Sequence, residues 1–222
     1  MSQVRPYQPI LLRLLHSAIA LLVIAALVTG FWVYNTYDQR WGSIPLPRLS
    51  DIQGIHGTIA VIVLLLLPIF ALYSFHLGSR RLVQAQSFSQ LQQVGKPIWW
   101  ISLHRFANTQ MLLAATLAVI TGRMMDEIWL PKGEFYHPWY VAHLIGWLLM
   151  LLSFALHGLL GAKVGGVPLL VSMWRWQIRP DDRPPNWLQG LVIKQPSWVL
   201  GLVETVVIGG IALAFILPVF KG

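Results

Sequence analysis

The sequence predicts an all-α integral membrane protein, in which a four-helix transmembrane bundle is followed by a fifth, C-terminal transmembrane helix. Of the 222 residues, 56% are hydrophobic and only 11% are charged, whereas soluble domains carry charge on about a quarter of their residues. Apolar runs of about 20 residues, the length that a helix needs to cross a bilayer, recur along the chain. They lie at residues 14–33, 55–77, 103–120, 139–160 and 198–220.

The first run follows Arg5 and Arg13, so it resembles a secretory signal peptide. It is too long for such a signal and it contains His16, so we expect it to stay in the protein as a transmembrane helix. The third run is the most polar at its start, where His104 and Arg105 lie. We expect residues 1–162 to form the bundle, 163–197 a loop on the cytoplasmic side, and 198–222 the additional helix.

The loops predict the orientation, because Lys and Arg collect on the cytoplasmic side of a membrane. We call the side of the N-terminus side A and the opposite side side B. The Lys and Arg residues expected on side A are Arg5, Arg13, Arg80, Arg81, Lys96, Arg105, Lys163, Arg175, Arg179, Arg183 and Lys194. Those expected on side B are Arg40, Arg48, Arg123, Lys132 and Lys221. Side A is therefore predicted to be cytoplasmic, with the C-terminus on the opposite side.

Charge and cysteine content exclude several classes of function. The formal net charge of +8 comes from basic residues scattered along one membrane face, which argues against nucleic-acid binding. The absence of Cys excludes disulfides, iron–sulfur ligation, Cys-rich zinc sites and thioether-attached haem.

Four histidines pair by their expected depth in the membrane. His16 opens the first run and His157 closes the fourth, so both lie near side A. His56 opens the second run and His143 opens the fourth, so both lie near side B. Ionisable residues inside a membrane are costly and are functional candidates by default.

The two histidines of the fourth run point the same way. Fourteen residues separate His143 from His157, which is about 21 Å along a helix with a residual rotation of about 40°. One helix thus presents a ligand to each of two stacked centres, and paired histidines on facing helices are a way to hold non-covalent b-type haem. Gly57 and Gly146 are small residues close to these histidines, where a porphyrin needs space.

The segments Leu-Leu-His16-Ser and Gly-Ile-His56-Gly, together with His104, His143 and His157, resemble the bacterial cytochrome b561 family. They also resemble the di-haem cytochrome b subunits of nickel–iron hydrogenases and formate dehydrogenases. The resemblance covers residues 10–162 and implies two haems b, held by His16 with His157 and by His56 with His143. It also implies electron exchange with quinone and a redox partner. The fifth run departs from this pattern.

Three further residues are candidates for contact with the haems. Arg13 lies one turn before His16, and Arg48 lies ahead of His56, so each is a candidate partner of a haem propionate; the alternative for each is a plain interfacial role. Met150 lies seven residues from each histidine of the fourth run, and either packs between the macrocycles or fills the core.

His104, Arg105 and Glu204 are candidates for a quinone or proton site. His104 has three open roles, which are to replace His16 as a ligand, to line a quinone pocket or to sit in the membrane interface. Glu204 lies about two turns into the fifth run, on its side A half, and either passes protons to a quinone or pairs with a cation such as Arg105.

The sequence therefore predicts a membrane di-haem b-type cytochrome that transfers electrons within or across the membrane, to or from quinone. If it is an enzyme, it is a quinone-linked oxidoreductase or a subunit of one, in a bacterial-type energy-transducing membrane. The first alternative is a haem-bearing membrane-anchor subunit of a larger redox complex. The second is a haem-free transporter or assembly scaffold.

Overall fold

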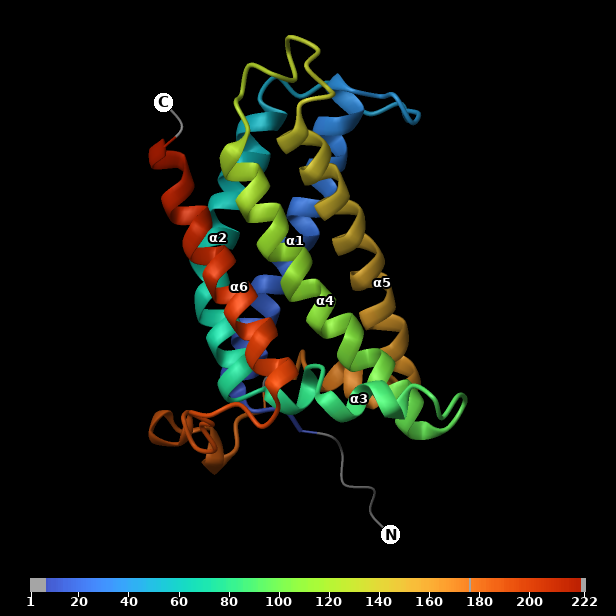
Figure 1. The fold of residues 1–222 in the computed structure, drawn as a ribbon, viewed down its shortest axis with the longest axis vertical. Coiled ribbons are helices and arrows are strands. Elements are labelled where there is room, and N and C mark those ends of the chain that lie inside the picture. Colours follow the sequence, from blue (N-terminus) through green and yellow to red (C-terminus); the bar gives the residue numbers. More distant parts are fainter. Residues whose placement is uncertain (1–6, 176, 221–222) are drawn as a thin grey trace.

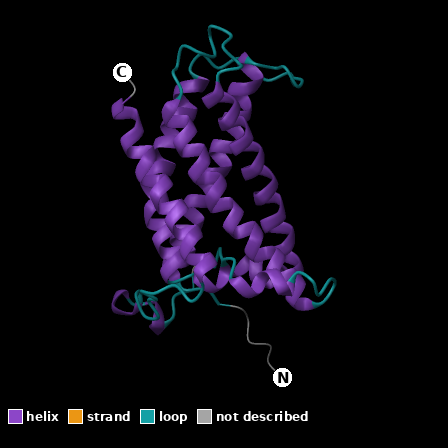
Figure 2. Ribbon diagram, in the orientation of Figure 1, coloured by secondary structure: helices purple, strands orange, loops and turns teal. Residues whose placement is uncertain are grey.

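A computed structural model describes residues 7–175 and 177–220, so the predictions made for Arg5 and Lys221 lie outside the described residues. Every regular element in this part of the chain is helical (Figure 2). The elements are α1 (Ile10–Tyr37), α2 (Ile52–His76), η1 (Ser79–Arg81), α3 (Ala85–Gln90), α4 (Pro97–Met124), α5 (Pro138–Ser172), η2 (Pro180–Asp182), η3 (Pro184–Asn186), α6 (Trp198–Ile216) and η4 (Leu217–Phe220).

Four helical segments of the described chain are long and apolar enough to cross a membrane, judged by length and composition. They are Ile10–Tyr37, Ile52–His76, Pro138–Ser172 and Trp198–Phe220. Large apolar side chains face outward on them, as Leu65 and Leu159 do with exposed fractions of 60% and 69%. Such a surface suits lipid and not water, and the chain is an integral membrane protein.

The third predicted span, α4, does not meet that standard, although it has 28 residues. Its first turns carry polar side chains that bind the segment after α2. Arg105 Nε donates to the Arg80 carbonyl at 3.1 Å, and Asn108 Nδ2 donates to the Arg81 carbonyl at 2.9 Å. The polarity of this end of α4 therefore serves packing against a side A segment.

The bundle consists of two helix pairs, with α1 packed along α2 and α4 packed along α5. Contacts between the two pairs are few, whereas α6 packs on α4 and α2 and lies beside them in Figure 1. The core between the helices contains Val23, Leu67, Leu112, Met150 and Val207. The space between the two pairs is where residues from all four helices meet.

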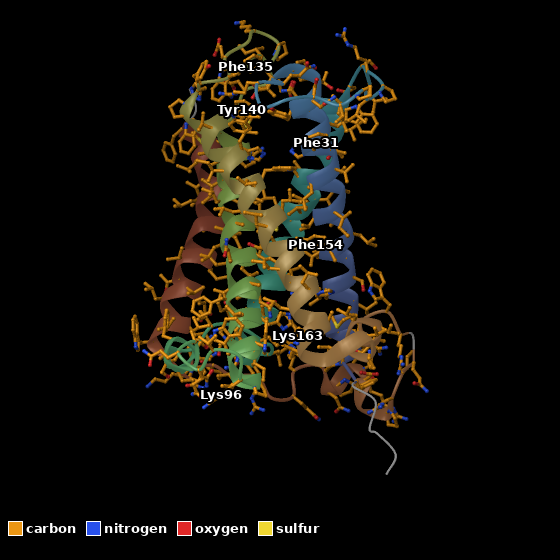
Figure 3. All side chains as sticks on the ribbon, turned by 90° about the vertical axis from the view of Figure 1, so that its right-hand side faces the viewer. Phe31, Lys96, Phe135, Tyr140, Phe154 and Lys163 are labelled. Carbon is orange, nitrogen blue, oxygen red and sulfur yellow. The ribbon has the colours of Figure 1, made fainter. Side chains whose placement is uncertain are left out.

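The helix ends define two faces of the bundle. Lys96 and Lys163 lie at the end where α1 begins, and Phe135 and Tyr140 lie at the opposite end (Figure 3). These ends correspond to side A and side B of the sequence interpretation. The chain enters α1 at one end of the bundle and leaves α6 at the other (Figure 1).

Two helix boundaries differ most from those expected. The helix α4 begins at Pro97, earlier than residue 103, because proline suits the first helical position. The helix α5 continues to Ser172, into the segment expected to be a loop. It bends at Gly166, whose φ of 64° and ψ of −174° are not helical. Residues that carry a Cβ rarely adopt this φ, so a glycine at this position allows the direction of the helix to change.

Candidate cofactor site

On side B, His56 of α2 and His143 of α5 face each other between the two helix pairs. Their ring centroids are 6.1 Å apart and the rings are inclined by 74°. Each ring is anchored through Nδ1, since His56 Nδ1 lies 3.0 Å from Thr29 Oγ1 and His143 Nδ1 lies 3.0 Å from Thr121 Oγ1. This leaves the Nε2 atoms as the candidate ligand positions of the pair.

A cavity of about 810 Å³ adjoins both side B histidines. Ligand sites of proteins commonly have volumes of about 300–1,000 Å³. Gly57 lines this cavity, and a Cβ built on it meets no atom within 4 Å. Met150 lines it too and is buried. The site is thus large enough for a flat macrocycle beside the histidines.

On side A, three histidines come together. The His16 and His157 ring centroids are 5.9 Å apart, and the His104 and His157 centroids are 5.2 Å apart. His157 Nδ1 lies 2.7 Å from Asn108 Oδ1. His16 Nδ1 and His104 Nε2 are buried and have no hydrogen-bond partner within the described part of the chain.

The separations of the rings provide a test of fit for haem. Two metal–imidazole bonds of about 2 Å, plus about 1 Å from each nitrogen to its ring centre, place two opposed ligands with centroids about 6 Å apart. The values of 6.1 Å for His56 with His143 and 5.9 Å for His16 with His157 agree with this distance. The 5.2 Å of His104 with His157 is shorter.

Within residues 7–175 and 177–220, no group of three or more His, Asp or Glu side chains is arranged to hold a metal ion. A haem iron between two imidazoles needs only two protein ligands, because the macrocycle supplies the others. The paired histidines and the cavity beside the side B pair meet this requirement.

The predicted cationic partners lie in different surroundings. Arg13 is buried, and its guanidinium donates to the carbonyls of Arg175 and Gln177 and meets Asp182 Oδ2 at 3.4 Å. Arg48 is exposed on the segment between α1 and α2. Arg123, in the last turn of α4, lines the side B cavity. The sequence did not single out Arg123 for this cavity, since only the fold shows which side B cation lines it.

Gly146 lies where α5 packs on α4. A Cβ built there meets Ala118 N and Leu117 Cγ at 3.5 Å each, which is ordinary van der Waals contact. Its small size serves the approach of the two helices, which brings Thr121 of α4 next to His143 of α5.

Glu204 is bound to α2. Its Oε1 lies 2.9 Å from His76 Nε2, and His76 Nδ1 lies 2.7 Å from the Val192 carbonyl. Arg105, the alternative partner, instead contacts the Arg80 carbonyl and Gln90 Oε1. The contacts therefore join α6 and the segment before it to the end of α2.

The sequence interpretation also missed Thr29, Thr121 and Asn108, which hold the Nδ1 atoms of three histidines. These contacts cross from α1 to α2 and from α4 to α5. A polar residue in an apolar run is visible in the sequence, but its partner on another helix is not.

A family model described as prokaryotic cytochrome b561 matches residues 7–176. No curated protein and no solved structure matches the chain. The matched range contains the five histidines gathered between the helix pairs and ends before α6.

Proposed function

The chain belongs to the prokaryotic cytochrome b561 family, and from this premise we propose that it is a di-haem b-type cytochrome that transfers electrons within or across the membrane, to or from quinone. His56 with His143 would hold one haem b, and His16 with His157 the other. The single observation that carries the proposal is the His56–His143 pair. Its ring centroids are 6.1 Å apart, and it lies beside a cavity of about 810 Å³.

A haem held by two imidazoles would supply one-electron exchange and would not bind oxygen. The protein residues supply orientation and exclusion of water. The side B cavity is lined by apolar residues such as Leu64, Val119 and Trp147. Trp147 also donates from Nε1 to the Leu27 carbonyl at 3.0 Å, which ties α5 to α1 along one wall of the cavity.

We further propose that α4 crosses the membrane as the third of five spans. At about 1.5 Å per residue, its 28 residues reach about 42 Å, which exceeds the hydrocarbon thickness of about 30 Å. An odd number of crossings places residues 7 and 220 on opposite sides, and the excess of Lys and Arg on side A makes that side cytoplasmic.

Quinone exchange is assigned to the side A end, where His104 lies beside His157 and Glu204 lies beside His76. A carboxylate there is suited to give or take the proton that accompanies quinone reduction. Arg105 lies one residue after His104 and remains part of this predicted site. A haem-bearing anchor subunit would share the bundle and differ by copurifying with a redox partner.

Haem content per chain, measured by the pyridine haemochrome assay on detergent-purified protein, tests the proposal. We expect two haems b and low-spin bands in the reduced-minus-oxidised spectrum. His56→Ala and His143→Ala are expected to lose the same haem, and His16→Ala and His157→Ala the other.

His137→Ala is the matched control. This histidine lies in the side B segment before α5, where its ring stacks on Trp129 at 3.5 Å, so both haems are expected to remain. A wild-type protein without haem, made with ample haem supply, would refute the cytochrome proposal. One haem per chain would refute the di-haem assignment.

A further inference from the structure

A threonine–glycine pair lies beside each side B histidine. Thr29 of α1 contacts His56 of α2, and Thr121 of α4 contacts His143 of α5, each with 3.0 Å between Oγ1 and Nδ1. The arrangement occurs once in each helix pair. In both pairs the threonine lies on one helix and contacts the histidine of the neighbouring helix. Two unrelated segments of the chain thus place the same group on the same ring atom.

The proton of each threonine hydroxyl is already committed. Thr29 Oγ1 donates to the Ala25 carbonyl at 2.7 Å, and Thr121 Oγ1 donates to the Leu117 carbonyl at 2.7 Å. A hydroxyl has one proton to donate and two lone pairs that accept. Each Oγ1 therefore accepts from the histidine ring, which requires the proton to be on Nδ1.

The glycine that follows each threonine makes room for the ring. A Cβ built on Gly30 lies 3.2 Å from both His56 Cε1 and Trp147 Cδ1, and one built on Gly122 lies 3.2 Å from His143 Cε1. These distances are shorter than ordinary van der Waals contact, so an alanine would push each ring away from its position. The hydroxyl and the missing Cβ together define where the ring stands.

We propose that Thr29–Gly30 and Thr121–Gly122 are positioning pairs that fix the Nδ1–H tautomer and orientation of His56 and His143. They thereby direct both Nε2 atoms to the side B centre. This inference rests on the proposed function, because the group to be bound is the haem assigned to that pair. A hydrogen bond at Nδ1 also raises the basicity of a metal-bound imidazole, so the threonines set the redox potential of side B.

The side A pair is held differently, which makes the effect site-specific. His157 Nδ1 meets the amide oxygen of Asn108 at 2.7 Å, and His16 Nδ1 is buried with no hydrogen-bond partner within the described residues. Removing a threonine hydroxyl should therefore change the side B haem and leave the side A haem unchanged.

Thr29→Val and Thr121→Val remove the hydroxyl and keep the side-chain shape. In the full-length haem-loaded protein, each is expected to weaken haem binding at side B by about 10-fold to 100-fold. The midpoint potential of that haem is expected to rise, because a less basic ligand favours the ferric state less. Thr29→Ser and Thr121→Ser retain a hydroxyl and should restore the wild-type potential and electron paramagnetic resonance g-values.

Thr36→Val on α1 and Thr116→Val on α4 are matched controls. Each removes a hydroxyl that donates to a carbonyl four residues earlier. Neither hydroxyl bonds to a histidine within the described residues, so both variants are expected to keep the wild-type potentials. Gly122→Ala provides a second route, since it keeps the Thr121 hydroxyl and the atoms that its Cβ would meet belong to the His143 ring. It should shift the side B g-values alone.

Two haems in the wild-type protein, with unchanged side B affinity and potential in both valine variants, would overturn the inference and leave the proposed function intact. The same holds if the control variants shift the potential as far as Thr29→Val does. Failure of the wild-type chain to bind haem at side B would instead refute the proposed function. The two failures are therefore distinguishable by the wild-type haem content.

Discussion

Asp182 caps the amino end of α1 from 172 residues further along the chain, where its Oδ1 accepts a hydrogen bond from Ile10 N at 2.8 Å. Its Oδ2 accepts from Arg179 N at 2.9 Å and faces Arg13 at 3.4 Å. The segment between α5 and α6 is thereby attached to the helix that carries His16, one turn after Arg13.

Asp182→Ala is expected to destabilise the protein by about 1 kcal/mol through the lost cap. It should lower stability further because the buried Arg13 loses its carboxylate partner. Asp182→Asn keeps an oxygen that can cap the helix and removes only the charge, so it should be milder. Thermal unfolding in detergent measures both. Equal melting temperatures for Asp182→Ala and the wild-type protein would contradict the capping role.

His104 is expected not to be a haem ligand, although it is the histidine closest to His157. Its ring centroid is 5.2 Å from that of His157, whereas the ring centroids of His16 and His157 are 5.9 Å apart. His104→Ala should therefore retain two haems and His16→Ala only one. The pyridine haemochrome assay on both variants decides the question, and the opposite pattern would make His104 the ligand.

Gly57 should be essential for keeping the side B cavity open beside His56. A Cβ on Gly57 meets no atom within 4 Å, and the residue lines the cavity next to His56. Gly57→Leu would fill the cavity without a clash in the helix bundle, so we expect a folded protein that lacks the side B haem. Gly209→Leu on α6 is the control, because a Cβ there also meets no atom within 4 Å. Loss of haem in both variants would argue for a general effect on folding.

The depth and rotation of the histidines could be predicted from the sequence. The period of a helix fixes where His143 and His157 point, and the apolar runs fix how deep they lie. The structure accordingly brings His56 next to His143 and His16 next to His157. Depth alone did not separate His16 from His104, because both lie near side A.

Contacts that depend on which helices are neighbours could not be predicted. Thr29 is part of an apolar run, and its contact with His56 cannot be predicted until α1 is known to pack on α2. Glu204 has a cation near it in the expected topology, but its partner is His76. Asp182 lies in a Pro-rich segment whose sequence gives no indication that it folds back onto α1.

Glu204 and His76 are in contact at the side A end of α2. The Val192 carbonyl can only accept, so His76 Nδ1 donates to it, and Glu204 Oε1 lies 2.9 Å from Nε2 on the other edge of the ring. An amide at position 204 cannot exchange a proton as a carboxylate does, so quinol-linked electron transfer in Glu204→Gln should fall by about 10² if this carboxylate is the proton donor or acceptor.

The same variant should keep two haems. The pair is partly exposed, so its loss should change the free energy of unfolding by no more than about 1 kcal/mol. Haem content and melting temperature therefore serve as controls for the turnover measurement. Wild-type turnover in Glu204→Gln would leave the pair a structural link between α6 and α2.

Arg123 is expected to contribute more to the side B site than Arg48 does. Both arginines are exposed, but Arg123 lies in the last turn of α4 and lines the cavity between the helix pairs, whereas Arg48 lies on the segment before α2. A guanidinium at the cavity can bind a carboxylate of the haem edge through two parallel hydrogen bonds. Removing that positive charge also stabilises the ferric form, since a cation near the iron disfavours oxidation.

We therefore expect Arg123→Ala to lower the side B midpoint potential and to speed haem loss, and Arg48→Ala to have a smaller effect on both. Arg123→Lys keeps the charge and loses the planar fork, so it should restore the potential more fully than the rate of haem loss. Redox titration separates the two haems, and transfer to a haem-accepting protein gives the loss rates. A larger shift in Arg48→Ala than in Arg123→Ala would instead support Arg48 as the partner of the haem carboxylate, as the sequence predicts.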